Sequence, residues 1–246
     1  MEIKNKIYIF IKLLKKVRNI HEYFLDYFGL KKDLYCLKLY GGIKIILRGG
    51  TTDRMIFNDI FLREEYSLKD KNKFNVVVDV GAHIGLFSLF ISNNSKKIIC
   101  FEPQKENFQI LKKNIKINNL KNIEIHNCAL SSKDGKIKLY APSGKNYDSF
   151  SVFEKNNKKF EWIESKNPKK ILKKIKKVDL LKLDCEGCEF SILPLLNFKK
   201  IDKICMEYHL SENKSKKFIM DILKKNFNQI KEKKYNSKLG LLYSEK

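Results

Sequence analysis

The segment from Val76 to Gly85, which reads Val-Val-Val-Asp-Val-Gly-Ala-His-Ile-Gly, constrains the fold more than any other part of the chain. Its first five residues are mostly β-branched and apolar, which is the composition of a central parallel strand covered on both faces. Gly81 and Gly85 lack a Cβ, so the chain can turn sharply there and a ligand can approach the backbone. From Ile84 onward the apolar residues follow helical spacing. The segment therefore predicts a strand, a glycine turn and a helix whose first N–H groups face a binding crevice.

The type of ligand follows from what the turn lacks and from its acidic residue. A dinucleotide loop needs Gly-x-Gly-x-x-Gly and a P-loop needs Gly-x-x-x-x-Gly-Lys-Ser/Thr, and neither pattern occurs here. Asp79, at the strand end, would repel a phosphate and suits a cationic group. The ammonium of an amino acid fits, and S-adenosylmethionine carries one. Glu102 ends the next predicted strand, and an acid about 20 residues on can accept both ribose hydroxyls.

Four segments occur in this order along the chain: Val78 to Ser88, Phe101-Glu102-Pro103, Cys128-Ala129-Leu130-Ser131 and Asp179 to Glu189. Together they resemble the FkbM family of S-adenosylmethionine-dependent methyltransferases. The earlier stretch from Leu47 to Arg54 is also similar to that family, so the resemblance covers about residues 40 to 210. It implies an O-methyltransferase that uses S-adenosyl-L-methionine and methylates a hydroxyl of a sugar, a surface glycan or another secondary metabolite.

The expected cofactor site follows the ends of the predicted strands. Asp79 is assigned to the ammonium and Glu102 to the ribose, and Pro103 fixes the turn after it. Asn127 ends the third strand where adenine would lie, so its side chain or a nearby backbone amide would bond the adenine edge. His83 is assigned to the cofactor loop rather than to catalysis. The expected cofactor-binding residues are Asp79, Gly81, Ala82, His83, Gly85, Glu102, Pro103, Asn127, Cys128, Ala129 and Asp184.

The catalytic candidates are Asp184 and Glu186, with Glu207 and His209 as the other two. Asp184 and Glu186 end the fourth strand, next to the expected place of the sulfonium methyl. One of them can orient the cofactor while the other accepts a proton or holds a substrate hydroxyl. His209 follows Glu207 at the end of the fifth strand and has a suitable ordinary pKa for proton transfer, with a structural hydrogen bond as its alternative role. One Asp and one Glu are too few ligands to argue for a metal, so none is predicted.

The formal net charge of +23 raises two alternatives. The first is a methyltransferase that acts on RNA or another nucleic acid, and the second is a non-catalytic module that binds a membrane or a complex. Only four of the 51 basic residues are arginine, the usual reader of phosphates and bases. No interleaving of aromatic residues with arginine is found. A nucleic-acid partner is therefore disfavoured. A non-catalytic module is also disfavoured, because it would not need the cofactor-binding acids Asp79 and Glu102.

The cysteines and the apolar runs bear on the compartment. Cys185 and Cys188 have C-x-x-C spacing but no second pair to complete a zinc set, so core packing is predicted for them. The first apolar stretch, Ile7 to Ile11, is too short for a signal peptide, and no run approaches the ~20 apolar residues that span a bilayer. A cytoplasmic protein is expected, with peripheral contact at the inner face of the membrane as an option.

Residues 1–70 are expected to form a helix, a hairpin and a second helix packed on the core. Ile3, Ile7, Ile11, Leu14 and Val17 form a helical stripe that predicts packing against the domain, and the basic amphipathic character of residues 3–28 also allows a membrane-surface contact. The hairpin pairs residues 34–39 with 43–48, and Thr52 is expected to cap a helix over residues 53–63.

Residues 71–246 are expected to form the cofactor-binding domain. Alternating strands and helices predict a Rossmann-like α/β fold, with a seven-stranded, mostly parallel sheet and a C-terminal antiparallel hairpin. Two short strand-like pieces are expected within residues 136–153, and a loop with one helix over 154–178. The expected strands are 75–79, 97–101, 123–127, 179–184, 202–208, 227–232 and 239–244, and the expected helices are 84–92, 104–118, 188–197 and 213–226.

Overall fold

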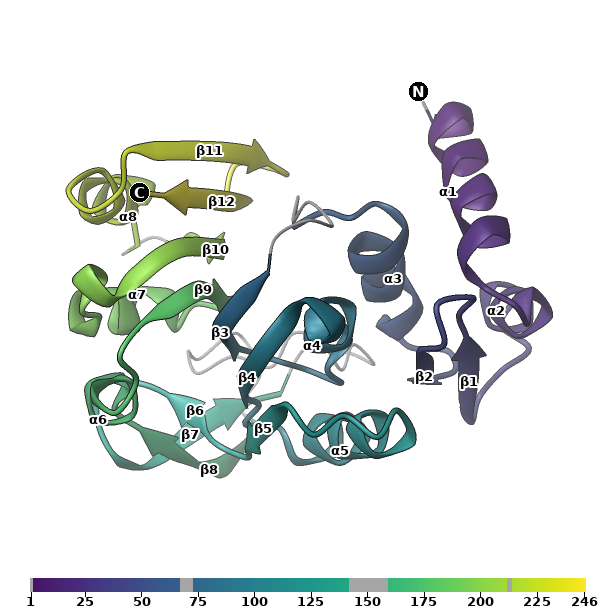
Figure 1. The fold of residues 1–246 in the computed structure, drawn as a ribbon, viewed down its shortest axis with the longest axis horizontal. Coiled ribbons are helices and arrows are strands. Elements are labelled where there is room, and N and C mark those ends of the chain that lie inside the picture. The colour runs from purple at the N-terminus through teal and green to yellow at the C-terminus, as the bar shows by residue number, and fades with distance from the viewer. Residues whose placement is uncertain (1, 67–72, 142–158, 212–213) are drawn as a thin grey trace.

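The structure, a computed structural model, describes residues 2–66, 73–141, 159–211 and 214–246. Its centre is a seven-stranded sheet with the order β11-β12-β10-β9-β3-β4-β5 (Figure 1). Only β12 runs antiparallel to its neighbours in this sheet. The predicted Rossmann-like fold is confirmed. The strands are β3 Phe74–Val80, β4 Ser95–Phe101, β5 Ile123–His126, β9 Val178–Leu183, β10 Ile201–His209, β11 Gln229–Lys234 and β12 Leu239–Glu245.

The strand order reverses beside β3, and this reversal creates the binding crevice. From β3 the chain proceeds outward through β4 and β5, and it then returns to form β9 on the other side of β3. In open parallel sheets, ligands bind at the carboxyl ends of the strands at such a reversal. The carboxyl ends of β3 and β9 therefore mark the expected position of the site.

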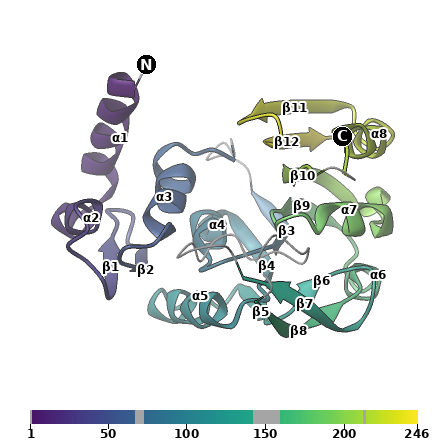
Figure 2. The same cartoon turned by 180° about the vertical axis from the view of Figure 1, so that it is seen from behind.

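Alternate residues of each central strand enter two different hydrophobic layers. Val77 belongs to a cluster with α4 and α5, whereas Val78 belongs to a cluster with α6, α7 and α8. Successive side chains of a strand point to opposite faces, so both faces of the sheet are covered (Figures 1 and 2). The helices are α4 Leu86–Ile91, α5 Lys105–Ile117, α6 Pro168–Lys173, α7 Glu189–Ile192 and α8 Lys216–Lys224, and the 3₁₀ turns are Ser92–Asn94, Leu193–Leu195 and Phe198–Lys200.

The N-terminal region lies at the end of the molecule beside α4 and α5 (Figure 2). Its elements are α1 Glu2–Lys16, α2 Ile20–Tyr27, β1 Leu34–Lys38, β2 Lys44–Arg48, α3 Asp53–Phe57 and a π-helical turn at Asn58–Leu62. The predicted hairpin is confirmed as β1 and β2. The continuous helical stripe over residues 3–28 is wrong, because the helix breaks at Val17, which forms a β-bridge with Leu39.

The face that α1 packs against the protein also differs from the prediction. Leu13 and Val17 are 1% and 2% exposed and join the core, whereas Ile7, Ile11 and Leu14 are 52%, 45% and 49% exposed. The periodicity is helical, as predicted, but a second apolar face carries the packing. The predicted stripe therefore points largely to solvent.

Two further local predictions are corrected by the structure. Thr52 makes no capping bond, and the hydroxyl of the preceding residue, Thr51, accepts the N–H of Asp53 at 3.2 Å instead. The lysine-rich stretch expected to be a loop with one helix contains α6 but also the strand β8, Phe160–Lys166. In β8 the inward Ile163 and Ser165 alternate with exposed Trp162 and Glu164. This alternation is typical of a strand with one buried face, although lysines surround the segment in the sequence.

The strand β8 completes a small second sheet with the order β6-β8-β7. The other members are β6 Ala129–Leu130 and β7 Gly135–Tyr140. β7 is one of the two strand-like pieces predicted within residues 136–153, and the other piece falls on residues 142–158, which lie outside the described residues. Leu139 and Ile163 pack with Ala129 in a separate hydrophobic cluster. This sheet forms one side of the ligand cavity.

Candidate functional site

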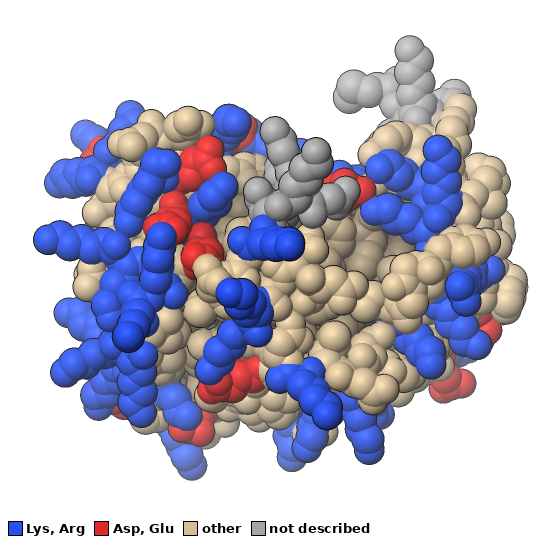
Figure 3. Space-filling model, in the orientation of Figure 1, with Lys and Arg blue, Asp and Glu red and all other residues tan. Residues whose placement is uncertain are grey.

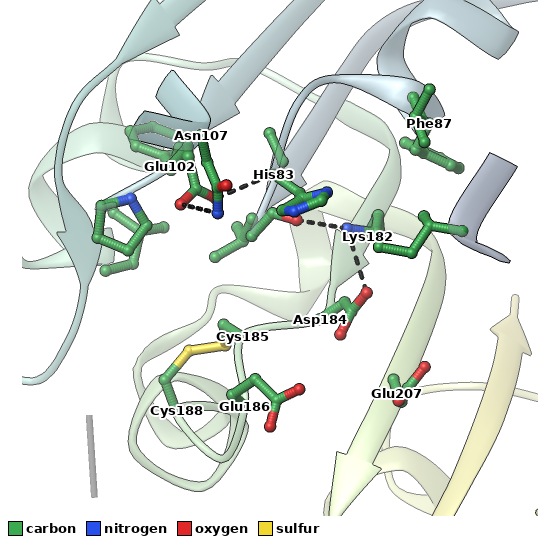
Figure 4. A pocket seen from close by; sticks show the side chains of 18 of the residues that line it. His83, Phe87, Glu102, Asn107, Lys182, Asp184, Cys185, Glu186, Cys188 and Glu207 are labelled. Carbon is green, nitrogen blue, oxygen red and sulfur yellow. Dashed lines mark hydrogen bonds and ion pairs between the residues drawn. A yellow bond between two sulfur atoms is a disulfide. The ribbon is translucent and has the colours of Figure 1, made fainter. Parts of the chain in front are cut away.

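A cavity lies where the strand order reverses, at the carboxyl ends of β3, β4, β9 and β10 (Figure 4). One part of its wall is mainly apolar and includes Phe101, Pro103, Cys128, Ala129, Leu130 and Leu139. Glu102 and the loop residues Gly81, Ala82 and His83 form the middle of the wall. The other part is acidic and includes Asp59, Glu65, Asp184, Glu186 and Glu207, together with Tyr66 and Lys182.

The loop after β3 is fixed against two neighbouring strands. The N–H groups of Gly81 and Ala82 donate to the carbonyl of Phe101 at 2.9 and 3.0 Å. Gly81 has φ +77°, and a Cβ on it would lie 1.7 Å from the carbonyl oxygen of Asp184. The glycine is therefore required by the close approach of the β9 backbone, and the helix α4 begins after Gly85 as predicted.

Glu102 lines the cavity in the position predicted for a ribose partner. One carboxylate oxygen accepts the backbone N–H of His83 at 2.8 Å, and the other accepts that of Gln104 at 2.9 Å. The side-chain amide of Asn107 lies farther away, at 3.4 Å. Because the group is only 4% exposed, burial raises the pKa of Glu102 to about 7, against the lowering by these donors.

Asp79 does not line the cavity, so the prediction that it contacts the ligand directly is wrong. Its carboxylate is fully buried, accepts the hydroxyl of Ser88 at 2.7 Å and pairs with Lys182 at 3.1 Å. The pairing follows from strand register, since positions 79 and 182 are partners across β3 and β9. Asp79 therefore holds the Lys182 ammonium in place behind the cavity wall.

Lys182 is a site residue that the sequence analysis did not single out. Its ammonium donates to the carbonyl of Gly81 at 2.8 Å and lies 3.6 Å from Asp184 Oδ2 and 5.7 Å from the ring centroid of Phe87. Although burial opposes the charge, the neighbouring carboxylates of Asp79 and Asp184 hold the pKa of Lys182 above its ordinary value. A lysine within the apolar run Leu180-Leu181-Lys182-Leu183 was the available signal, because lysine is rarely buried without a partner.

The acidic residues predicted after the fourth strand do meet at one end of the cavity. Asp184 lies at the end of β9, where Tyr66 donates to its Oδ2 at 3.4 Å. Glu186 also lines the cavity and has φ +53°. Glu207 faces them from β10, and its burial together with the negative charge of Asp184 raises the pKa of Glu207 to about 7.

His209 does not fit the predicted role of general base. Its Nε2 lies 3.4 Å from Glu207 and 3.5 Å from Glu186, and its Nδ1 lies 3.3 Å from Glu189. These three carboxylates raise the pKa of His209 far above its ordinary value, although burial opposes the charge. The imidazole is therefore protonated at neutral pH and cannot accept a proton, which favours the alternative structural role.

Asn127 is also placed differently from the prediction. Its side-chain amide donates to the carbonyls of Glu102 and Pro103 at 2.9 and 3.1 Å, and the residue does not line the cavity. Its side chain therefore fixes the turn after β4 and is not turned to an adenine. Cys128 and Ala129 do line the apolar part, as predicted.

Cys185 and Cys188 form a disulfide at the cavity wall, which the sequence analysis did not predict (Figure 4). The predicted core packing is nevertheless present, because Cys188 is buried in a hydrophobic cluster and Cys185 packs against it. Their Cα atoms are 5.5 Å apart, within the usual range for a disulfide. The turn formed around Glu186 and Gly187, both with positive φ, brings the two cysteines together. The remaining cysteines are free, and Cys100, Cys128 and Cys205 are buried.

The acidity of the cavity contrasts with the basic surface. On the face shown in Figure 3, lysine and arginine side chains crowd the left side, and others lie near the middle and along the lower and right edges. The acidic end of the cavity is lined by five carboxylates, of which Asp59 is paired with Arg63 and Glu65 with Lys233, while Asp184 lies beside Lys182. A cation is therefore favoured in this end of the cavity and an anion is disfavoured.

Comparison with known proteins agrees with this geometry. The family model described as the methyltransferase FkbM domain matches residues 79–235, more than half of the chain. Methyltransferase sdnD of Sordaria araneosa is 28% identical, with 57% of this chain and 67% of that protein covered, and Methyltransferase 1 of Beauveria bassiana is 24% identical, with 61% and 69% covered.

A crystal structure of methyltransferase FkbM from Methylobacillus flagellatus matches with a TM-score of 0.49 and 16% identity. That match covers 76% of this chain and 47% of the other, so the chain spans about half the length of that protein. The extent of the family-model match settles the assignment. The chain belongs to the FkbM family of methyltransferases.

Proposed function

We propose that the protein is an S-adenosylmethionine-dependent O-methyltransferase whose cofactor binds in the cavity between β3 and β9. The order of chemical character along the cavity wall is the observation that carries the proposal. An apolar part around Ala129 suits adenine, Glu102 in the middle suits ribose, and the acidic end suits a sulfonium and an ammonium. Asp184, which lines the cavity, takes the ammonium role that the sequence assigned to Asp79.

The bonding of Glu102 supports the assignment to ribose. A carboxylate offers about four lone-pair sites, two on each oxygen. His83 and Gln104 each use one site with a short bond, on different oxygens. Each oxygen therefore keeps capacity for one hydroxyl donor, as a ribose diol requires, and the amide of Asn107 at 3.4 Å is the weaker competitor.

The acceptor hydroxyl would enter at the acidic end. The sulfonium of the bound cofactor supplies an activated methyl group, so holding the hydroxyl in line with it gives much of the rate. Glu186 is the carboxylate we assign to the hydroxyl proton, because it lines the cavity whereas His209 is protonated and does not. Asp184 and Lys182 would orient the cofactor beside it.

The same acidity favours a sugar or another metabolite hydroxyl over a nucleic acid. A phosphodiester backbone near Glu65, Asp184, Glu186 and Glu207 would meet several negative charges. A neutral or cationic acceptor meets no such repulsion. We therefore propose the hydroxyl of a glycan or a secondary metabolite as the acceptor class.

Calorimetric titration with S-adenosylmethionine and with S-adenosylhomocysteine tests the proposal directly. Glu102→Gln is expected to weaken binding of both ligands at least tenfold, the loss of a charged hydrogen-bond acceptor. Glu124→Gln is the matched control, since Glu124 is a surface residue at the end of the sheet. No binding by the parent protein, or equal losses in both variants, would remove the assignment.

We also propose peripheral contact of the N-terminal helices with an anionic membrane surface. No helix in the described parts of the chain has the length and apolar character needed to cross a bilayer. However, α1 presents Ile7, Ile11 and Leu14 to solvent, and Phe28 and Leu30, after α2, are 68% and 70% exposed. The formal charge of +23 is complementary to anionic lipids.

A further inference from the structure

Beside Asp184, at the acidic end of the cavity, lie Glu207 and His209, two side chains that cofactor binding alone leaves unexplained. Asp184 ends β9, while Glu207 and His209 end the neighbouring parallel strand β10. One potential ligand atom from each of the three lies within 4.8 Å of the others. We propose that Asp184, Glu207 and His209 bind a divalent cation that holds the acceptor hydroxyl.

The orientation of His209 is the second observation that favours a cation. Its Nδ1 contacts Glu189 Oε1 at 3.3 Å, which turns Nε2 toward Glu207 and Glu186. Glu189 is completely buried and its other oxygen, Oε2, has no hydrogen-bond partner. Metal-bound histidines almost always donate their second ring N–H to such a carboxylate, which fixes the tautomer and the ring orientation.

The charges around the cluster also leave room for a cation. Asp184, Glu186 and Glu207 line one end of the cavity, and the buried carboxylate of Glu189 lies behind it, in contact with His209. Lys182 is the fixed cation beside them, and it is already shared with Asp79. The four carboxylates outnumber the Lys182 ammonium and the His209 imidazole that lie among them, and a divalent cation held by Asp184, Glu207 and His209 would offset part of the negative charge.

The donor set indicates which cations fit. Two carboxylate oxygens and one imidazole nitrogen suit Mn²⁺ or a similar transition metal better than Mg²⁺, which prefers oxygen ligands alone. Three protein ligands leave positions open for a hydroxyl. Figure 4 shows Asp184, Glu186 and Glu207 at the same side of the cavity.

The chemical consequence depends on the proposed function. A cation that coordinates the acceptor oxygen lowers the pKa of the hydroxyl. Its proton passes to Glu186, the O–CH₃ bond forms, and the S–CH₃ bond breaks with its electron pair left on sulfur. The products are the methyl ether and the neutral thioether, so no oxidant or reductant is needed.

Mn²⁺ binding tests the inference without cofactor or acceptor. The full chain is stripped with EDTA, dialysed and titrated with Mn²⁺, and free Mn²⁺ is followed by electron paramagnetic resonance. We expect one tightly bound Mn²⁺ per chain and a nitrogen modulation in the pulsed spectrum from one imidazole ligand. His209→Gln should lose the nitrogen signal and weaken binding at least tenfold, whereas Asp184→Asn should weaken it while keeping the signal in the remaining bound fraction.

His126→Gln is the matched control, because His126 also contacts a carboxylate, Glu124 at 2.8 Å, but lies outside the cluster. Its Mn²⁺ affinity and nitrogen signal should equal those of the parent. The parent spectrum decides even when a variant fails to fold, since an absent nitrogen signal or absent stoichiometric binding overturns the inference. Retention of the signal in folded His209→Gln overturns it as well.

Separate titration with S-adenosylmethionine distinguishes the two proposals. Cofactor binding without Mn²⁺ binding would remove the cation and leave the proposed methyltransferase function. Mn²⁺ binding without cofactor binding would support the cation site and remove the proposed cofactor assignment.

Discussion

Single charged side chains at strand ends determine the chemistry of this site. Asp79 and Lys182 are partners across β3 and β9, and both are almost completely buried. The pair leaves the Lys182 ammonium at the cavity wall and in contact with the carbonyl of Gly81. A buried ion pair of this kind costs desolvation energy, so its value lies in positioning groups rather than in net stability.

Lys182→Met is expected to destabilise the protein by roughly 3–5 kcal/mol, because it leaves the charge of Asp79 buried without its partner. The double variant Asp79→Asn, Lys182→Met removes both charges and should recover about half of that loss or more. Urea unfolding of the parent, both single variants and the double variant gives the coupling energy. Strictly additive losses would show that the two residues do not act as a pair.

The pKa of Glu102 predicts a pH dependence of ligand binding. Because burial raises this pKa to about 7, the carboxyl group is largely protonated at pH 6 and largely ionised at pH 8. The ionised form accepts both ribose hydroxyls, so the affinity for S-adenosylhomocysteine should rise as pH increases through 7 and then level off. Below pH 7 it should fall by up to about tenfold per pH unit.

The comparison with Glu102→Gln isolates this group, since Glu207 titrates in the same range. The variant should bind more weakly at pH 8 and show a smaller pH dependence than the parent. Calorimetric titrations from pH 5.5 to 8.5 measure both quantities. An identical pH profile in the two proteins would show that Glu102 does not face the ribose.

For single residues, the sequence predicted the position of a side chain where that position depends only on the neighbouring residues in the chain. Glu102 follows directly from its place after a strand. The partner of Asp79 could not be read, because it depends on the register of a strand about 100 residues later in the chain. The protonation of His209 likewise depends on three carboxylates that only the folded chain brings together.

The elements of the main sheet were predictable because their periodicity is strong. The apolar strands and the glycine turn appear with boundaries shifted by only a few residues. β8 was missed because its aromatic residues Phe160 and Trp162 are exposed while its inward positions are Ile163 and Ser165, so it has no clear alternation of apolar inward and polar outward residues. The packing face of α1 was missed because the helix has two apolar faces, and sequence alone does not say which one meets the core.

The close contact between the β3 loop and the end of β9 predicts that replacing Gly81 by alanine destabilises the protein more than the same change at Gly42, which lies outside this contact. Gly81→Ala should cost more than 3 kcal/mol or prevent folding, because the new Cβ would lie 1.7 Å from the Asp184 carbonyl oxygen. Gly42→Ala is the matched control, with φ +88° but no atom within 4 Å of the added Cβ. It should cost only about 1–2 kcal/mol, the strain of the left-handed backbone.

Urea unfolding of the two glycine variants measures this difference. Similar losses would mean that backbone strain alone, rather than contact with β9, explains the cost. A larger loss for Gly81→Ala supports the loop as the element that joins β3 to the end of β9.

The exposed face of α1 predicts binding to lipid vesicles. The parent should sediment with vesicles that contain anionic phosphatidylserine and much less with neutral phosphatidylcholine. The triple variant Ile7→Ser, Ile11→Ser, Leu14→Ser should lose at least tenfold in binding, because it removes the apolar side chains that would enter the interface.

The double variant Lys112→Gln, Lys113→Gln is the control for this experiment, because it lowers the charge on α5 without changing α1. It should bind vesicles nearly as well as the parent. Unchanged binding by the triple variant would remove the membrane assignment. A concentration-dependent dimer of the parent, seen by ultracentrifugation and abolished in the triple variant, would also remove the membrane assignment.

For the whole molecule, the hydrophobic core does not divide at residue 70. Leu37 and Leu47 of the N-terminal hairpin belong to the same buried cluster as Leu86 and Ile98. Polar contacts cross the same boundary, since the side chain of Asn114 bonds both backbone groups of Ile46. The two segments expected from the sequence are therefore packed as one body, although the sequence shows them as different patterns.

This shared core predicts a single cooperative unfolding transition. Amide hydrogen exchange, followed by mass spectrometry in increasing urea, compares residues 34–48 with the central strands β3 and β9. The slowest amides of both regions should lose protection at the same urea concentration, because removing the hairpin would expose buried faces of α4 and α5. Calorimetry should give equal calorimetric and van't Hoff enthalpies. If the hairpin instead lost protection at clearly lower urea, residues 1–70 would be a separate folding unit and the buried cluster would not act as one core.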